Sequence, residues 1–129
     1  MEKKKILLID DEEDFCFLIK KHIEALGDFI VHTATSGAKG LEAAKKIKPD
    51  LIILDLVMPE MDGFAVLQQL KQDSICKEIP VIILTALESH LSKLKAMKFY
   101  DEYYLVKPVD AKDLIIKIEE VLKIRNIIK

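Results

Sequence analysis

Residues 51–63 read Leu-Ile-Ile-Leu-Asp-Leu-Val-Met-Pro-Glu-Met-Asp-Gly, and this stretch decides how the rest of the chain is interpreted. Leu51 to Leu54 form an unbroken apolar run between turn-forming residues, which is typical of a strand buried on both faces of a parallel sheet. Asp55 follows at the carboxyl end of that strand. Because ligands and chemistry collect at this edge of an α/β sheet, Asp55 is a candidate reactive carboxylate. Taken alone, an Asp at this place is more often a solvated residue that begins a loop.

Strand and helix patterns alternate on both sides of this stretch. Apolar runs predict further strands at residues 6–9, 29–33, 80–85 and 103–106, and periodic apolar residues predict a helix after each strand. Five such units in one small domain indicate a doubly wound, flavodoxin-like α/β fold with a five-stranded parallel sheet. The strand order 2-1-3-4-5 is one of the common arrangements of this class, although sequence alone does not prove it.

The predicted helices carry recognisable ends. The first has an apolar stripe of Phe15, Leu18, Ile19, Ile23 and Leu26, and Gly27 is expected to close it as a C′ residue. Ser36 and Asp62 are expected to cap the second and third helices, the fourth carries Leu87, Leu91, Leu94 and Met97, and Asp110 with Asp113 resembles a capping box before the last.

Length and composition limit the class of protein. With 129 residues, half of them hydrophobic and a third charged, the chain fits one soluble domain, and its net charge of -2 offers no field that would gather nucleic acid or an anionic membrane. The apolar run Ile6 to Ile9 is too short for a signal peptide or a membrane span, and Cys16 and Cys76 have no metal-ligand spacing. We therefore expect a cytoplasmic protein with reduced, packed thiols.

Polar residues follow four of the predicted strands. Asp10 and Asp11 follow the first, Asp55 the third, and Thr85 and Lys107 end the fourth and fifth. With the strand order given above, these side chains converge at one edge of the sheet. Three neighbouring carboxylates raise one another's pKa unless a cation intervenes, and Mg²⁺ suits a site with few carboxylates that leaves room for water and a phosphate.

Each of these residues also has a simpler explanation. Acidic residues favour the start of a helix, Thr favours strands, and a Lys before Pro is usually solvated. Their joint occurrence favours chemistry, because a nucleophilic Asp, two more acids, a hydroxyl donor and a cation are the parts needed to transfer a phosphoryl group to a carboxylate.

The motifs Asp10-Asp11, residues 55–63, Thr85-Ala86 and residues 104–108 resemble, over essentially the whole chain, the receiver domain of two-component response regulators. The resemblance implies one receiver domain over residues 1–129, either stand-alone like a chemotaxis regulator or cut from a longer regulator. It implies that Asp55 is the phosphoacceptor and receives its phosphoryl group from the phosphohistidine of a sensor histidine kinase or phosphotransfer protein.

The resemblance also implies the roles of the remaining site residues. Asp11, Asp55 and the Val57 carbonyl would hold Mg²⁺, with Asp10 acting through water. Thr85, the Ala86 N–H and Lys107 would bind the phosphoryl group, Tyr104 would change rotamer with Thr85, and Lys107-Pro108 would be a cis peptide. The apolar Val57 and Leu87 would flank the path of attacking water, so we expect slow self-dephosphorylation.

The implied function is a signalling switch rather than a turnover enzyme. Output to a downstream protein or domain, or a homodimer, would use the helix around residues 91–97, the strand at Tyr104 and the last helix, which carries apolar residues beyond its main stripe. A dehalogenase-like phosphatase is disfavoured because Val57 stands where it needs a second acid. A receiver-like interaction module that is never phosphorylated remains the alternative.

Overall fold

The computed structural model describes residues 3–58, 62–86, 103–125 and 127–128. Its sheet has five parallel strands in the order β2-β1-β3-β4-β5, which confirms the predicted fold class and strand order. The strands are β1 (Lys4–Ile9), β2 (Phe29–Ala34), β3 (Leu51–Asp55), β4 (Val81–Thr85) and β5 (Tyr103–Val106). Each lies within two residues of its predicted bounds.

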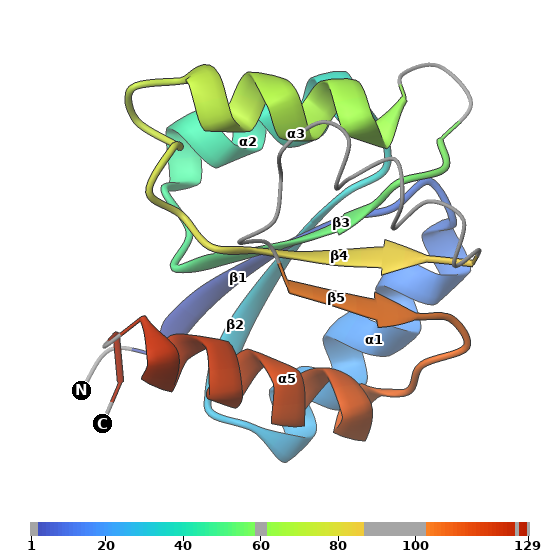
Figure 1. The fold of residues 1–129 in the computed structure, drawn as a ribbon. Coiled ribbons are helices and arrows are strands. Elements are labelled where there is room, and N and C mark those ends of the chain that lie inside the picture. Colours follow the sequence, from blue (N-terminus) through green and yellow to red (C-terminus); the bar gives the residue numbers. More distant parts are fainter. Residues whose placement is uncertain (1–2, 59–61, 87–102, 126, 129) are drawn as a thin grey trace.

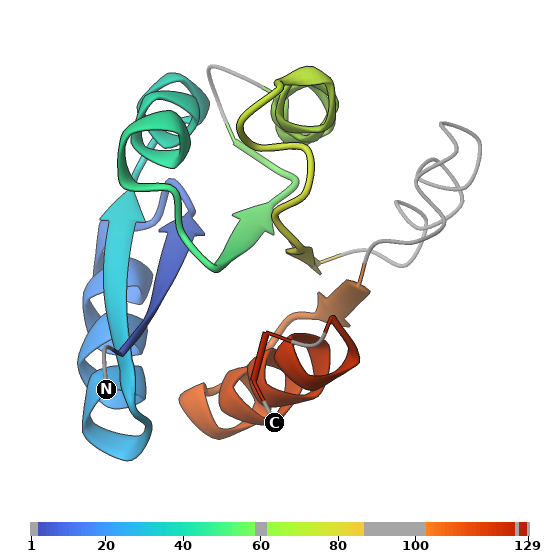
Figure 2. The same cartoon turned by 90° about the vertical axis from the view of Figure 1, so that its left-hand side faces the viewer.

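Helices cover both faces of the sheet. Within the described residues they are α1 (Glu13–Leu26), α2 (Gly37–Ile47), α3 (Gly63–Gln72) and α5 (Ala111–Ile124). Figures 1 and 2 show α2 and α3 on one face and α1 and α5 on the other. Two separate apolar clusters fill the spaces between the sheet and these helix layers. The helix expected around Leu87 to Met97 lies outside the described residues.

The local sequence explains why these elements form. Every residue of β3 and β4 is buried, as expected for unbroken apolar runs covered on both faces. Ser36 and Asp62 accept hydrogen bonds from N–H groups in the first turns of α2 and α3, and Asp110 and Asp113 form a complete capping box before α5. These caps were all predicted.

The sequence prediction for the buried face of α1 was partly wrong. Leu18 and Leu26 are 50% and 61% exposed, because the face that packs on the sheet is formed by Cys16, Ile19 and Ile23. Gly27 ends the helix as predicted, and its N–H donates to the Ile23 carbonyl at 2.8 Å, but its backbone is extended, with φ of -130°, rather than left-handed. Its small size matters instead, since a Cβ there would lie 2.8 Å from the ring of Phe29.

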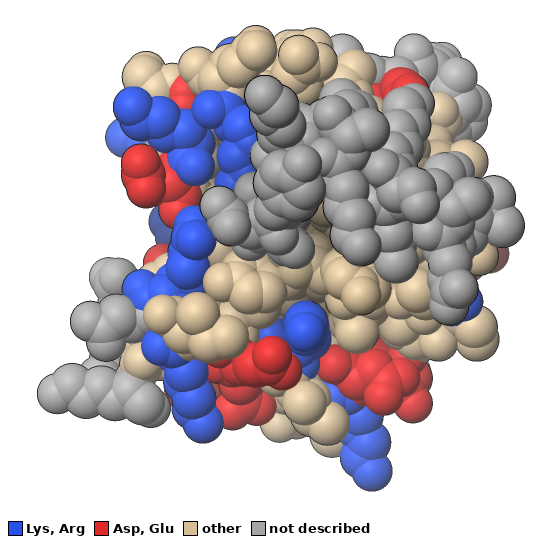
Figure 3. All heavy atoms as spheres, in the orientation of Figure 1, with Lys and Arg blue, Asp and Glu red and all other residues tan. Residues whose placement is uncertain are grey.

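The parallel sheet delivers the carboxyl ends of its strands to one edge. The register pairs Ile9 with Leu54, Asp55 with Leu84 and Thr85 with Val106, so the residues that follow β1, β3, β4 and β5 emerge side by side. On the face shown in Figure 3, basic and acidic residues are interspersed, in keeping with the small net charge. Within the described part of the chain, no helix combines the length and the apolar character that crossing a membrane requires.

Candidate functional site

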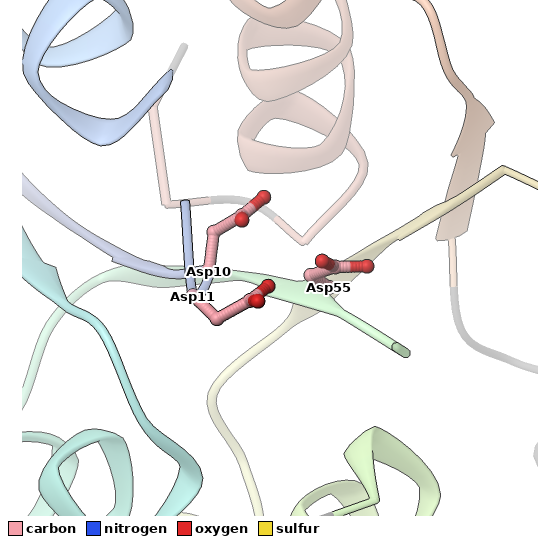
Figure 4. Close-up of side chains that lie close together, drawn as sticks. All are labelled: Asp10, Asp11 and Asp55. Carbon is pink, nitrogen blue, oxygen red and sulfur yellow. The ribbon is translucent and has the colours of Figure 1, made fainter. Parts of the chain in front are cut away.

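Three carboxylates meet at the carboxyl edge of the sheet. Asp10 and Asp11 directly follow β1, and Asp55 is the last residue of β3. One oxygen from each lies within 4.8 Å of the others, and Figure 4 shows the three side chains lying close together. Asp10 and Asp55 are buried and Asp11 is half-buried. The predicted cluster of hard oxygen donors is therefore present.

The two buried carboxylates are fixed by backbone N–H groups. The Glu12 N–H donates to Asp10 Oδ1 at 3.0 Å, and the Val57 N–H donates to Asp55 Oδ1 at 3.1 Å. The second oxygen of each carboxylate faces Lys107, whose ammonium Nζ lies 3.0 Å from Asp10 Oδ2 and 3.6 Å from Asp55 Oδ2. Lys107 thus connects the end of β5 to the ends of β1 and β3.

Two further neighbours of Lys107 were not predicted. The Glu12 carboxylate lies 3.5 Å from Nζ, and Nζ lies 4.7 Å from the centroid of the Phe15 ring. The sequence placed Glu12 merely at a helix start and Phe15 in the apolar stripe of α1. The available signal was proximity along the chain, because both residues stand within one helical turn of Asp11.

Burial controls the electrostatics of the site. It raises the pKa of both Asp10 and Asp55, while the Glu12 and Val57 N–H groups oppose this effect. The negative charges of Asp10 and Asp11 raise the pKa of Asp55 further. Burial would lower the pKa of Lys107, but the hydrogen bond and the charge of Asp10 outweigh it and raise that pKa. One ammonium therefore balances three converging carboxylates, which leaves the site favourable for another cation.

This arrangement of acids and lysine agrees with the comparison with known families. Residues 6–119 match the family model described as response regulator receiver domain. The chain belongs to this family. Response regulators are part of two-component signalling, so this receiver is a signalling domain rather than a turnover enzyme.

Known relatives agree with this assignment. The receiver is similar to the DNA-binding dual master transcriptional regulator RpaA of Synechocystis sp., with 36% identity over 119 residues, which are 92% of this chain and 49% of that protein. It is also similar to a CheY-like response regulator receiver domain protein of Methanospirillum hungatei (TM-score 0.85, 25% identity, 96% of this chain and 97% of that one). A third similar structure is that of chemotaxis protein CheY4 of Vibrio cholerae, with a TM-score of 0.83 and 29% identity, over 93% of this chain and 99% of that one. The chain spans about half the length of the curated relatives it matches.

The structure also describes most of the other predicted residues of the receiver. Thr85 ends β4 and is fully buried, and its carbonyl accepts a hydrogen bond from the Lys107 N–H at 2.8 Å. Ala86 follows it at the surface. Val57 and Tyr104 are exposed, and the Lys107-Pro108 peptide is cis, as expected. Leu87 lies outside the described residues.

Gly63 lets α3 begin close to the end of β3, where the phosphoacceptor candidate lies. A Cβ at this position would lie 2.4 Å from the Leu56 Cα and 2.5 Å from the Asp55 carbonyl oxygen, closer than any real Cβ contact. The Gly63 N–H donates to the Leu56 carbonyl at 3.0 Å. The sequence marked Asp62-Gly63 only as a turn and a helix cap. The structure adds that a glycine is needed for α3 to begin against the backbone at Asp55.

Proposed function

We propose that Asp55 accepts a phosphoryl group from the phosphohistidine of a sensor histidine kinase or phosphotransfer protein, in a reaction that depends on Mg²⁺. The observation that carries this proposal is the placement of one Asp55 oxygen 3.6 Å from a lysine ammonium and among two further carboxylates. A carboxylate nucleophile, a cation and a cluster of metal-binding acids together suit phosphoryl transfer.

The chemistry follows from these groups. A carboxylate oxygen of Asp55 attacks phosphorus, an oxygen–phosphorus bond forms, and the bond from phosphorus to the imidazole nitrogen breaks. The three carboxylates fit Mg²⁺, because they offer hard oxygen donors and their negative charges are only partly balanced. Asp11, Asp55 and the Val57 carbonyl would hold the ion, with Asp10 acting through water. The bound ion would supply positive charge for the phosphoryl oxygens.

The residues around the phosphoryl group would bind it and change conformation in response. It adds roughly -1.5 to -2 charge and three strong acceptor oxygens. The Thr85 hydroxyl, the Ala86 N–H and Lys107 would bind these oxygens, and Tyr104 would respond to the movement of Thr85. Two arrangements of the segment between Thr85 and Lys107 would then differ in population.

The output surface would include β5 and α5. A groove of about 390 Å³ lies between them, lined mainly by Leu105, Val106, Pro108, Val109, Ile116 and Lys117. Ile116 is 66% exposed, which supports a downstream protein, an output domain or a second copy as the partner. The expected surplus of apolar residues on the last helix is smaller than predicted, because Ile115, Ile127 and Ile128 pack against the core.

The proposal extends to the whole chain: residues 1–129 would form one receiver domain that acts in the cytoplasm, without direct contact to nucleic acid or membrane. Both cysteines are free and buried, which supports a reducing compartment.

Mass spectrometry of the intact protein tests the proposal. The chain is incubated with acetyl phosphate, with Mg²⁺ or with a chelator. We expect the mass of one phosphoryl group to be added with Mg²⁺, none with the chelator, and none in an Asp55→Asn variant. Asp28→Asn, which changes an exposed Asp, is the matched control and should be labelled like the wild type. An unmodified wild type would instead favour a receiver-like interaction module that is never phosphorylated.

A further inference from the structure

The first turn of α1 supplies an aromatic partner to the lysine of the site. The Lys107 ammonium lies 4.7 Å from the centroid of the Phe15 ring and 3.5 Å from Glu12 Oε1. The Lys107 side chain is only 18% exposed, so little water competes for this contact. Phe15 itself is partly buried and packs against the apolar cluster between the sheet, α1 and α5. Its ring therefore belongs to the fixed framework of the domain.

An aromatic ring holds a cation differently from a carboxylate. The hydrogen bond from Lys107 to Asp10 at 3.0 Å uses one N–H of the ammonium and fixes its direction. The attraction to a ring face is electrostatic and leaves the N–H groups available. The ring can therefore keep the ammonium in place while its hydrogen bonds pass from Asp10 to a group attached at Asp55, only 3.6 Å away.

We propose that Phe15 is a positioning residue for phosphoryl transfer, whose ring holds the Lys107 ammonium beside the Asp55 carboxylate before and after the phosphoryl group arrives. The inference rests on the proposed function. It adds a residue outside the acidic, hydroxyl and lysine set, one that acts on the reacting atoms only through Lys107.

The same helix offers a matched control. Phe17 also lies beneath a lysine, with the Lys21 Nζ 5.9 Å from its ring centroid. Phe17 is 65% exposed and takes no part in the acidic site. The same substitution at Phe17 therefore alters an aromatic ring on α1 but leaves the surroundings of Lys107 unchanged.

Site-specific incorporation of 3,4,5-trifluorophenylalanine tests the proposal with little change in shape, because fluorine withdraws charge from the ring face. At position 15 we expect the rate of Mg²⁺-dependent labelling by acetyl phosphate to fall at least about two- to fivefold, because that is the range for an exposed cation–π contact and the Lys107 side chain is only 18% exposed. At position 17 we expect the wild-type rate. Equal rates for the wild type and the position 15 variant, or the same loss at both positions, would overturn the inference. A wild type that is not labelled at all would instead defeat the proposed function.

A second readout does not depend on phosphorylation. In metal-free protein carrying ¹³C-labelled lysine, the Lys107 Cε protons should show an upfield ring-current shift. Phe15→Leu should abolish that shift, and Phe17→Leu should preserve it. A Lys107 signal that is the same in the wild type and in Phe15→Leu would show that the ring does not place the ammonium.

Discussion

Neutralising the phosphoacceptor candidate should make the metal-free protein more stable. In Asp55→Asn the side chain keeps an oxygen that can accept the Val57 N–H, now 3.1 Å from Asp55 Oδ1, and it keeps nearly the same shape. What it loses is a buried negative charge. The substitution therefore isolates the electrostatic cost of placing Asp55 beside Asp10 and Asp11.

The size of the effect follows from the distances. At an effective dielectric constant of about 20, two like charges at most 4.8 Å apart repel by at least about 3.5 kcal/mol. On the same scale the attraction between Asp55 and Lys107 at 3.6 Å is about 4.6 kcal/mol. The repulsion of Asp55 by Asp10 and Asp11 together exceeds its attraction to Lys107. Water around the half-buried Asp11 weakens the repulsion from that residue. We expect the free energy of unfolding to rise by about 1 to 3 kcal/mol.

Urea unfolding followed by circular dichroism measures this difference. With a chelator present, the midpoint of Asp55→Asn should lie about 1 M above that of the wild type if the urea dependence is about 2 kcal/mol per molar. Mg²⁺ should raise the wild-type midpoint more than that of the variant. Asp28→Asn serves as the exposed control and should leave the midpoint unchanged. An Asp55→Asn variant no more stable than the wild type without metal would refute the electrostatic reasoning.

The difference in stability between Asp55→Asn and the wild type should depend on pH. Burial, followed by the charges of Asp10 and Asp11, raises the pKa of Asp55 above 3.8 in the folded protein. The charged carboxylate therefore destabilises the fold above its raised pKa, and this cost disappears as the pH falls through that pKa toward 3.8. The advantage of Asp55→Asn should shrink over the same interval.

Three further substitutions test other parts of the structure. Gly63→Ala should lower the free energy of unfolding by more than about 2 kcal/mol, roughly the scale of overpacking a rigid site, and should slow labelling. Gly40→Ala should cost less in urea unfolding, because its Cβ would meet only the side chain of Ile9. Val57→Asn should speed loss of the aspartyl phosphate about tenfold, followed by mass spectrometry over time, if it supplies about 1.4 kcal/mol by orienting water. Glu24→Ala removes the acceptor of the Val31 N–H at the edge of the sheet and should cost about 1 kcal/mol. That N–H lowers the pKa of Glu24 below 4.5, so the loss should be full above pH 4.5 and should fade as the pH falls below it.

The sequence predicted the strands well because their signals are local. The buried runs of β3 and β4 are apolar without interruption, and each ends in the polar residue that forms the site. In a parallel sheet all such ends share one edge, so Asp55 and Thr85 were placed correctly once the fold class was known. Strand order was a choice among common arrangements, and the structure confirms it.

The details that escaped prediction depend on how a helix is rotated against the sheet. Apolar residues occupy more than one face of α1, and the pattern alone did not distinguish buried Cys16 from exposed Leu18. The same rotation turns Phe15 and Glu12 toward Lys107, which comes from the far end of the chain. Contacts between residues so distant in sequence leave no periodic signal in either segment.

Identification of the modified residue tests the central claim most directly. After labelling with acetyl phosphate and Mg²⁺, borohydride reduction converts an aspartyl phosphate to homoserine, which peptide sequencing by mass spectrometry then locates. We predict homoserine at position 55, and unchanged aspartate at positions 10 and 11. Homoserine at position 10 or 11, or a labelled protein with unmodified Asp55, would contradict the assignment of the phosphoacceptor.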